Sequence, residues 1–320
     1  MSSVENKLKK SLARFGERID NGSYYEAQQT IRSITNRYVH SKNYEAAISL
    51  LYQSTMILLE SKQYDEAADL YLYMLEVFEN FSSEEFEKDG INKVVSVLSL
   101  FPDTDANLQN LAKESNKFLI NKLGNPVGSP RVNFLLGTKL FNSGDKKLIN
   151  QGERYLFLTQ ELKALDMIIE FEIKSYETEG EKDKIGIYFA RVVIPYLMIK
   201  NIRFAQLSLN KMLQHFEGTF NYTNVGDLKI FETEGYNEEL SKSLQLINFL
   251  QMLISLLQRG QKSDSNIFSV LLKRYQPILQ SYEGLYEKIN QISITYYGVS
   301  YIRKQTNMLQ SMMGNLLGGK

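Results

Sequence analysis

Cysteine is absent from this sequence, and histidine and proline are scarce, with 2 and 5 copies in 320 residues. Without cysteine the chain has no disulfides, thiolate nucleophiles or Cys-ligated zinc, which fits a reducing compartment. His40 and His215 lie far apart in the chain, so a multi-histidine metal site or a Ser-His-Asp triad lacks residues. No Gly-x-x-x-x-Gly-Lys-Ser/Thr motif occurs to bind ATP. The sequence therefore predicts a protein that is not an enzyme and has no cofactor or metal.

A net charge is also missing, because Lys and Arg number 37 and so do Asp and Glu. Chains that bind nucleic acid or anionic membranes usually carry a basic excess. The N-terminus has no apolar run typical of an export signal. Of the two most apolar windows, Val192–Ile199 is too short to span a bilayer, and Leu244–Leu257 contains Gln245, Asn248 and Gln251. We expect a cytosolic protein that binds no nucleic acid and inserts no segment into a membrane.

A short motif recurs in the first 80 residues, as Tyr25-Glu26-Ala27, Tyr44-Glu45-Ala46 and Tyr64-Asp65-Glu66-Ala67, at steps of 19 and 20 residues. Such a step is half the period of a repeated helical hairpin. Each copy follows a short polar break, which is typical of a helix end, a tight turn and a new helix start. Four consecutive helices with minimal loops are predicted.

Apolar residues follow the helical period, as Leu8, Leu12, Phe15 and Ile19 do in the first helix. One helix cannot bury such a stripe alone, whereas stacked antiparallel hairpins can. The predicted fold is an all-α, TPR-like α-solenoid of stacked antiparallel helical hairpins with about 14 helices. Beyond residue 80, helical patterns cover 91–100, 108–123, 132–141, 148–176, 182–199, 204–216, 237–259, 265–281 and 284–303.

The helical pattern is interrupted once, at Gly218–Glu234, where Phe220–Thr223 and Leu228–Phe231 flank a turn containing Gly226. We interpret this segment as a small β-hairpin near 219–232. A lone hairpin is marginally stable, so it must lean on the helices or on another chain. The predicted organisation is an N-terminal half at 1–140, a C-terminal half at 141–305 that carries the hairpin, and a flexible apolar tail at 306–320.

Charge is polarised at the N-terminal end. Residues 1–43 carry eight basic and four acidic side chains, a net +4, whereas residues 60–89 carry two and ten, a net −8. Helical spacing places these charges on two faces. The basic face, on the first predicted helix, consists of Lys7, Lys10, Arg14 and Arg18; the acidic face, on the fourth, consists of Asp65, Asp69, Tyr73 and Glu76. Either the two faces bind a bipolar partner, or both are solvated surfaces that keep the protein soluble.

The helix predicted behind the hairpin is apolar around most of its circumference, with Phe249, Leu250 and Leu253 among its residues. Such a helix is buried on more than one side. Either neighbouring helices of the solenoid or a segment of a partner protein can provide that burial.

Several runs of the sequence resemble the fungal scaffold subunit of the GET pathway, which guides the entry of tail-anchored proteins and has a counterpart in the mammalian transmembrane-recognition complex. They are Lys7-Leu8, Arg14-Phe15, Tyr24–Ala27, Thr30–Ile34, Asn36–Tyr38, Ser41-Lys42 and Tyr44-Glu45, with Lys304–Leu309, Met312-Met313 and Leu316–Gly319 at the C-terminus.

The resemblance implies a non-catalytic cytosolic adaptor with two partners. Its N-terminal helices would dock on the dimeric targeting ATPase through Lys10, Arg14, Arg18, Arg32, Arg37 and His40, and Asp69, Tyr73 and Glu76 would tune the ATPase's nucleotide-bound state. Its C-terminal half would bind the N-terminal segment of a ubiquitin-like subunit through Phe220, Tyr222, Leu228, Ile230, Phe249, Leu250 and Leu253. That subunit in turn would recruit a TPR co-chaperone carrying a client.

Two other classes of protein are weighed against this adaptor. A generic TPR-like scaffold of another complex, such as a proteasome-lid subunit or a vesicle adaptor, would keep the fold without these partners. An RNA-binding helical repeat needs a continuous basic surface, and the zero net charge and the acidic fourth helix argue against it.

Overall fold

The computed structural model describes residues 3–159, 161–179 and 181–302, so the tail predicted at 306–320 lies outside the described residues. The chain divides into two compact units, Met1–Ala164 and Leu165–Lys320. In each unit successive helices pack against one another, and the predicted all-α solenoid is confirmed. The sequence pattern divides the chain at residue 140, whereas the first unit also includes the helix at Lys146–Phe157, which packs closely against its predecessor.

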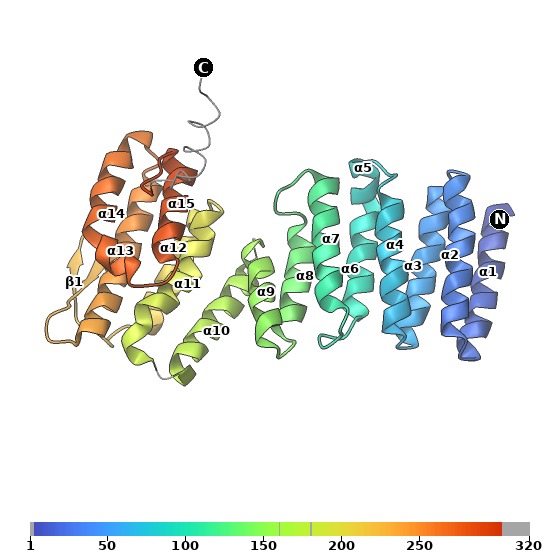
Figure 1. The fold of residues 1–320 in the computed structure, drawn as a ribbon, viewed down its shortest axis with the longest axis horizontal. Coiled ribbons are helices and arrows are strands. Elements are labelled where there is room, and N and C mark those ends of the chain that lie inside the picture. Colours follow the sequence, from blue (N-terminus) through green and yellow to red (C-terminus); the bar gives the residue numbers. More distant parts are fainter. Residues whose placement is uncertain (1–2, 160, 180, 303–320) are drawn as a thin grey trace, which may run out of the picture. The chain divides into compact units, whose positions relative to one another are not determined.

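The helices of the first unit lie side by side in the order of the chain (Figure 1). They are α1 (Ser3–Asp20), α2 (Tyr24–His40), α3 (Tyr44–Glu60), α4 (Tyr64–Phe78), the single turn α5 (Ser83–Glu85), a π-helical turn (Phe86–Gly90), α6 (Ile91–Leu100), α7 (Leu108–Leu123), α8 (Pro130–Phe141) and α9 (Lys146–Phe157). The four helices predicted from the repeated motif are confirmed, and three of them start at Tyr24, Tyr44 and Tyr64, each 20 residues apart.

One turn geometry joins the first four helices. Gly22, Lys42 and Lys62 adopt positive φ angles of 74°, 57° and 59°, again at intervals of 20 residues. The Lys42 N–H donates to the Val39 carbonyl at 2.9 Å, and the Asn43 N–H donates to the Tyr38 carbonyl at 2.8 Å. These bonds satisfy the carbonyls at a helix end and reverse the chain within three residues.

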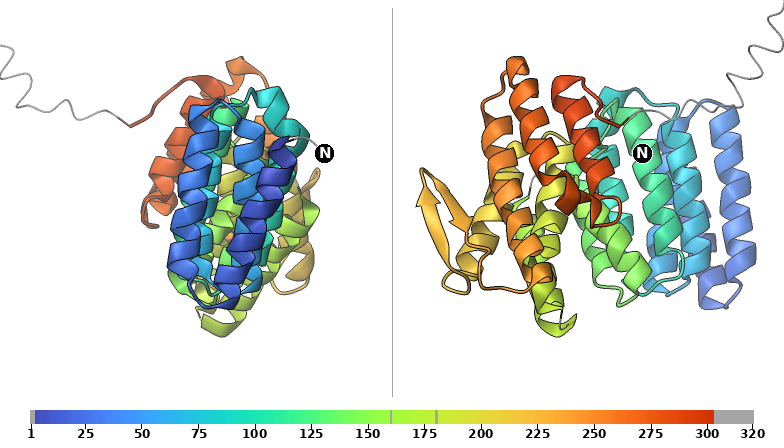
Figure 2. Two further views of the ribbon diagram at one scale, coloured as in Figure 1. Left: turned by 90° about the vertical axis from the view of Figure 1, so that its right-hand side faces the viewer. Right: turned by 60° about the vertical axis from the view of Figure 1, so that its left-hand side comes forward.

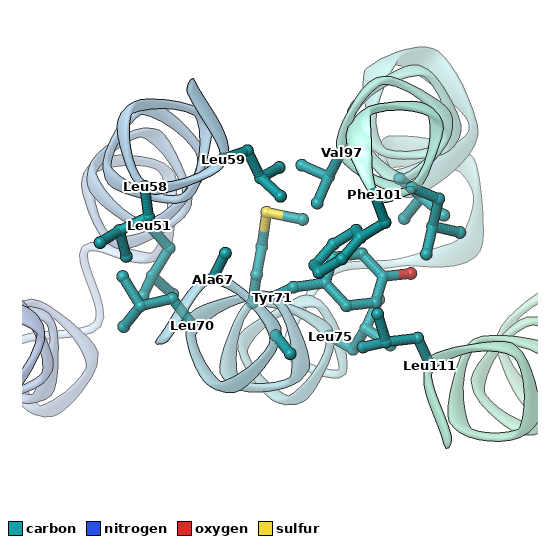
Figure 3. Packing of buried hydrophobic residues seen from close by; sticks show 14 of the residues in the cluster. Leu51, Leu58, Leu59, Ala67, Leu70, Tyr71, Leu75, Val97, Phe101 and Leu111 are labelled. Carbon is teal, nitrogen blue, oxygen red and sulfur yellow. The ribbon is translucent and has the colours of Figure 1, made fainter. Parts of the chain in front are cut away.

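The core of the first unit is continuous from α1 to α8. Its centre is filled by side chains of α3, α4, α6 and α7, with Leu51, Leu58 and Val97 among those around α4 (Figure 3). Tyr71 of α4 is fully buried, and its hydroxyl lies 2.6 Å from the Ser115 hydroxyl of α7. Burial raises the pKa of Tyr71, because the phenolate would lose its hydration.

Two local features of the first unit differ from the sequence pattern. The predicted helix at 148–176 is interrupted, since α9 ends at Phe157 and α10 starts at Leu162. At the interruption the Thr159 hydroxyl donates to the Leu156 carbonyl at 2.9 Å, a bond that competes with helix continuation. The α5 turn was not predicted, and it starts with a capping box in which the Ser82 and Glu85 side chains bond each other's backbone N–H.

The second unit contains all but the first three residues of α10 (Leu162–Glu179), a 3₁₀ turn (Lys182–Lys184), α11 (Ile185–Met198), α12 (Ile202–His215), β1 (Tyr222–Val225), β2 (Leu228–Phe231), α13 (Glu238–Gln258), a 3₁₀ turn (Lys262–Asp264), α14 (Ser265–Gln280) and α15 (Leu285–Tyr297). The two strands pair antiparallel around Gly226 and Asp227, as predicted, and the hairpin stands at the edge of the unit (Figure 2). The pattern predicted to 303 ends as a helix at Tyr297, where Gly298 adopts a φ of 74°.

Candidate protein-binding surfaces

Exposed basic side chains gather on α1 and α2, which lie next to each other (Figure 2). This cationic face consists of Lys10, Arg14, Arg18, Arg37 and His40, all of them exposed. Arg18 is bonded within the chain, because its guanidinium donates to the Glu26 carbonyl at 3.3 Å and to the Thr30 hydroxyl. The face therefore offers several charged groups to an acidic partner.

A hollow of about 410 Å³ lies between α1 and α2 within this face. Arg14 and Arg18 line it together with the apolar side chains Phe15, Ala27 and Ile31. Such a combination of cations and apolar side chains suits an acidic segment that also carries an apolar residue.

Arg32 does not belong to the cationic face, although the sequence groups it with those residues. Its Nη1 lies 2.7 Å from Asp69 Oδ2 on α4, and its guanidinium lies over the Tyr73 ring, 4.8 Å from the centroid. The Gln28 amide also donates to Asp69, and the Tyr73 hydroxyl donates to the Asn36 side-chain oxygen. These five residues are here called the Arg32 cluster. In it, the basic Arg32 contacts Asp69 and Tyr73, which the sequence pattern assigns to a separate acidic face.

Tyr73 is half-buried in this cluster. Partial burial raises the pKa of Tyr73, and the nearby Arg32 charge opposes that rise. Glu76, the third residue predicted to act on the ATPase, is exposed at the far end of the same face of α4. Glu76 and Glu79 border a hollow of about 240 Å³ between α4 and α7 that Leu72 and Phe118 also line. Glu76 is thus the predicted acidic residue that most readily meets a partner.

The hairpin is fastened to α13 by two side-chain amides, Asn248 and Gln251, here called the amide clamp. The Phe231 N–H donates to Asn248 Oδ1 at 2.8 Å, and Asn248 Nδ2 donates to the Phe231 carbonyl at 2.9 Å. Gln251 makes the same pair of bonds with Lys229, at 2.9 and 2.7 Å. The two amides occupy the outer edge of β2 in the way that a third strand would.

The predicted hairpin residues Phe220, Tyr222, Leu228 and Ile230 are all half-exposed. Leu228 lines a hollow of about 360 Å³ between α12 and the hairpin. Lys229 Nζ lies 2.7 Å from the Glu217 carboxylate and 5.0 Å from the centroid of the Tyr222 ring. The bond from Lys229 lowers the pKa of Glu217, and the same bond raises the pKa of Lys229.

Phe249, Leu250 and Leu253 require a correction, because the structure buries all three in the core of the second unit. The Phe249 ring packs on Tyr275 of α14, with 5.4 Å between the centroids, and α13 also packs against α11. These residues are therefore covered by the chain itself and present no surface to a partner. Of the two sources of burial that the sequence allows, neighbouring helices or a partner segment, the structure shows the neighbouring helices.

Helix α13 is also long and apolar enough to span a membrane by length and composition alone. Within the fold, however, 67% of its apolar window is buried, as in the core helix of a globular unit. Two of its buried polar residues, Asn248 and Gln251, are the residues of the amide clamp. Amides three residues apart on an apolar helix are the signal that could have identified the clamp from the sequence.

Metal and catalytic sites are not apparent among the residues that the structure describes. No group of three or more His, Asp and Glu side chains in this part of the chain is placed to hold a metal ion. His40 is exposed on the cationic face, and His215 lies on α12, with Nε2 3.6 Å from the Glu177 carboxylate. What the described residues form is a set of charged faces, shallow hollows and a fastened hairpin on stacked helices, the arrangement of a helical-repeat scaffold protein.

Comparison of this chain with known proteins, by sequence and by structure, identifies one family within this class. The family model for Golgi to ER traffic protein 4 matches residues 41–317. Golgi to ER traffic protein 4 of Schizosaccharomyces pombe is 26% identical over 316 residues, covering 99% of this chain and 96% of its own. The human homolog is 23% identical over 314 residues, covering 98% of this chain and 85% of its own. The crystal structure of C. therm. Get4 aligns with a TM-score of 0.75 and 25% identity, covering 98% of this chain and 96% of that chain.

The chain belongs to the Golgi to ER traffic protein 4 family. This result confirms the resemblance noted in the sequence, and the fold agrees with it. The family consists of adaptors of the GET pathway, which targets tail-anchored membrane proteins, and the chain has that general role.

Proposed function

We propose that this chain is a cytosolic, non-catalytic adaptor that brings the dimeric targeting ATPase of the GET pathway together with a ubiquitin-like subunit. The ubiquitin-like subunit in turn recruits a TPR co-chaperone that carries the tail-anchored client. Such an adaptor accelerates client transfer by raising the effective concentration of one partner near the other. It also biases the ATPase toward the conformation that it binds more tightly.

The observation that carries the proposal is the exposed cationic face of α1 and α2. In a chain without net charge, this local basic excess favours an acidic protein surface over nucleic acid. The hollow between α1 and α2, which Arg14 and Arg18 line together with Phe15 and Ile31, adds apolar contact area that a purely electrostatic site would lack. The first unit is therefore the proposed docking site of the ATPase.

The second unit supports the other half of the proposal. The amide clamp gives the hairpin a defined position, and the half-exposed Phe220, Tyr222, Leu228 and Ile230 provide apolar surface on it. Aromatic residues with part of their surface exposed are typical anchors of protein interfaces. We assign the ubiquitin-like partner to this hairpin surface, with Phe249, Leu250 and Leu253 acting only as its supporting core.

The ATPase half is tested by measuring the affinity of the purified chain for the purified ATPase over a range of salt concentrations. Arg14→Glu and Arg37→Glu should each weaken binding about tenfold or more, with the largest loss at low salt. Lys146→Glu is the matched control, since Lys146 is also exposed but lies on α9 of the same unit. Equal affinities for all three variants and the unchanged chain would rule out the cationic face as the docking site.

The other half is tested by co-purification with the ubiquitin-like subunit in a high-salt wash. Leu228→Asp should release the subunit, because it places a charge on the proposed apolar contact. Val270→Asp is the control, since Val270 is exposed on α14 of the same unit rather than on the hairpin. Retention of the subunit by Leu228→Asp, with the hairpin still folded, contradicts this half alone.

A further inference from the structure

One face of α9 borders a hollow of about 600 Å³ that neither proposed partner surface includes. The side chains of α9 that line it recur at helical spacing, so they form a continuous stripe along the helix. This α9 stripe consists of Lys147, Asn150, Gln151, Arg154 and Tyr155, with Leu158 directly after the helix. Gln109, at the start of α7, completes the lining.

Helix α9 is held firmly in the first unit, so the stripe has a defined direction. Gly152 lies so close to α8 that an added methyl group would come within 2.7 Å of the Gly137 carbonyl oxygen. At the start of the helix the Asp145 carboxylate accepts from the Lys147 and Leu148 N–H groups, at 2.7 and 3.3 Å. Such a cap fixes the first turn of a helix.

The charge of the stripe is not balanced within its lining. Lys147 and Arg154 are both exposed, and no acidic residue is among the described residues that line the hollow. Neither cation forms an ion pair within the described part of the chain. Lys139 of the neighbouring α8, by contrast, is bonded to Asp103 at 2.8 Å. The hollow therefore favours a ligand that carries negative charge.

The spacing of the two cations indicates the form of that ligand. Lys147 and Arg154 are seven residues apart, which is about 10.5 Å along a helix axis, too far for both to bind one small anion. An extended chain of the polyproline II type rises about 3.1 Å per residue and repeats every three residues. Two carboxylates three residues apart on such a chain are therefore about 9 Å apart on the same side, close to the spacing of the cations.

The amides of the lining suit the backbone of an extended segment. Gln109 and Asn150 are exposed at the hollow, and an extended chain leaves its N–H and C=O groups free to bond them, whereas a helix does not. The amide clamp shows the same use of side-chain amides in this chain, because Asn248 and Gln251 bond the backbone of β2. Two cations are too few to follow a nucleic-acid backbone.

We propose that the α9 stripe binds an extended acidic segment of a partner protein. Lys147 and Arg154 pair with carboxylates three residues apart, and Gln109 and Asn150 bond the backbone between them. The site is separate from the cationic face and from the hairpin, so it gives the adaptor a third contact that the proposed function does not include.

The test is fluorescence anisotropy of labelled peptides with the purified full chain at low salt. A peptide of repeated Glu-Pro-Ala triplets should bind at least about tenfold more tightly than one of Gln-Pro-Ala triplets, which lacks the charge. A peptide of the same composition with its Glu residues in one block should bind at least about threefold more weakly than the triplet peptide, because its carboxylates cannot reach both cations.

Variants of the chain locate the bound peptide. Lys147→Gln and Arg154→Gln should each weaken binding of the triplet peptide about threefold or more, and Asn150→Asp should weaken it as well by adding a like charge. Lys9→Gln is the control, since it removes an exposed cation of α1 that lies outside both sites and should change affinity less than about twofold. Thermal unfolding of each variant shows whether it remains folded.

The outcomes separate this site from the docking face. Loss of binding by Arg14→Glu, with full binding by Lys147→Gln and Arg154→Gln, would place the peptide on the cationic face and overturn the proposal. Equal affinity for the triplet and block peptides would overturn it too, because only charge would then be recognised. The experiment contains neither the ATPase nor the ubiquitin-like subunit, so its result does not depend on the proposed function.

Discussion

Asn248 and Phe231 exchange two hydrogen bonds, at 2.8 and 2.9 Å, in which one side-chain amide serves both backbone groups of a strand residue. A two-stranded hairpin alone is marginal in water, and this contact explains how the hairpin keeps its place on the second unit. Gln251 makes the same two bonds with Lys229, two residues before Phe231 on β2. The surface proposed for the ubiquitin-like partner is therefore formed by the chain's own contacts.

Replacing Asn248 by Asp should loosen the hairpin while the helices remain folded. The carboxylate cannot donate to the Phe231 carbonyl, and a buried charge there lacks a partner, so the hairpin should lose about 1 to 3 kcal/mol. Hydrogen exchange of residues 219–236, compared with α13, measures this local loss. Gln245→Glu on the same helix serves as the control, because Gln245 is outside the clamp, and equal protection in both variants would contradict the role of the clamp.

Much of the fold is predictable because short local sequence patterns determine where its helices begin and end. The Tyr-Glu-Ala motif and the polar breaks predict helix starts that agree with α2, α3 and α4 to within one residue. The sequence pattern does not predict the interruption after Phe157, because the bond found there, from the Thr159 hydroxyl to the Leu156 carbonyl, lies in an otherwise helical apolar pattern. Helix periodicity describes averages over many residues and does not detect such a local competitor.

The candidate site is only partly predictable for a different reason. Charge and spacing place Arg14, Arg37 and Glu76 on exposed faces, as the structure has them. Neither property indicates that Arg32 pairs with Asp69, because that contact depends on how α2 packs against α4. In the same way, the burial of Phe249 depends on its neighbours α11 and α14 rather than on α13 itself.

Gly186→Ala should destabilise the second unit by about 2 to 4 kcal/mol. At this position α11 crosses α13 so closely that an added methyl group would overlap the Ser243 carbonyl oxygen. The Gly186 N–H also donates to the Ser243 hydroxyl at 2.6 Å, and separating the helices would weaken that bond. Urea unfolding followed by circular dichroism measures the loss.

Gly16→Ala is the natural comparison for that variant, because an added methyl group meets nothing within 4 Å in α1. It should instead stabilise the first unit by up to about 1 kcal/mol through helix propensity. A similar loss of stability in both variants would argue that the close α11–α13 approach is not the cause.

Lys42→Gly should raise the stability of the first unit by about 0.5 to 1 kcal/mol, and Lys62→Gly should do the same. Both lysines occupy left-handed backbone positions that cost an ordinary residue energy, and Gly22 already fills the equivalent position between α1 and α2. Differential scanning calorimetry provides the measurement. Lys9→Gly, in the interior of α1, should have the opposite sign, and a loss of stability in all three variants would contradict the turn argument.

Alkaline pH should destabilise the protein above about pH 10 in a way that depends on Tyr71. Its pKa is raised in the fold by burial, so the unfolded chain loses this proton first and stability falls as pH rises toward the folded pKa. Tyr71→Phe should make that decline shallower, although it costs about 1 kcal/mol at neutral pH by removing the bond to Ser115. Urea unfolding at several alkaline pH values, with Tyr25→Phe at an exposed site as the control, tests the slope; identical slopes in all chains would refute it.

Several long-range polar contacts in the first unit share a similar spacing. Side chains joined across α2 and α4, across α4 and α7 with its N-cap, and from α8 to α6 and the loop after it are separated by 36 to 44 residues, as in Arg32–Asp69 and Tyr71–Ser115. Gain or loss of one 20-residue helix would reverse the direction of every helix that follows and would separate these partners, whereas gain or loss of two would preserve them. A helix pair is thus the smallest segment that can be gained or lost while these contacts are kept. Natural length variants are expected to differ by about 40 residues.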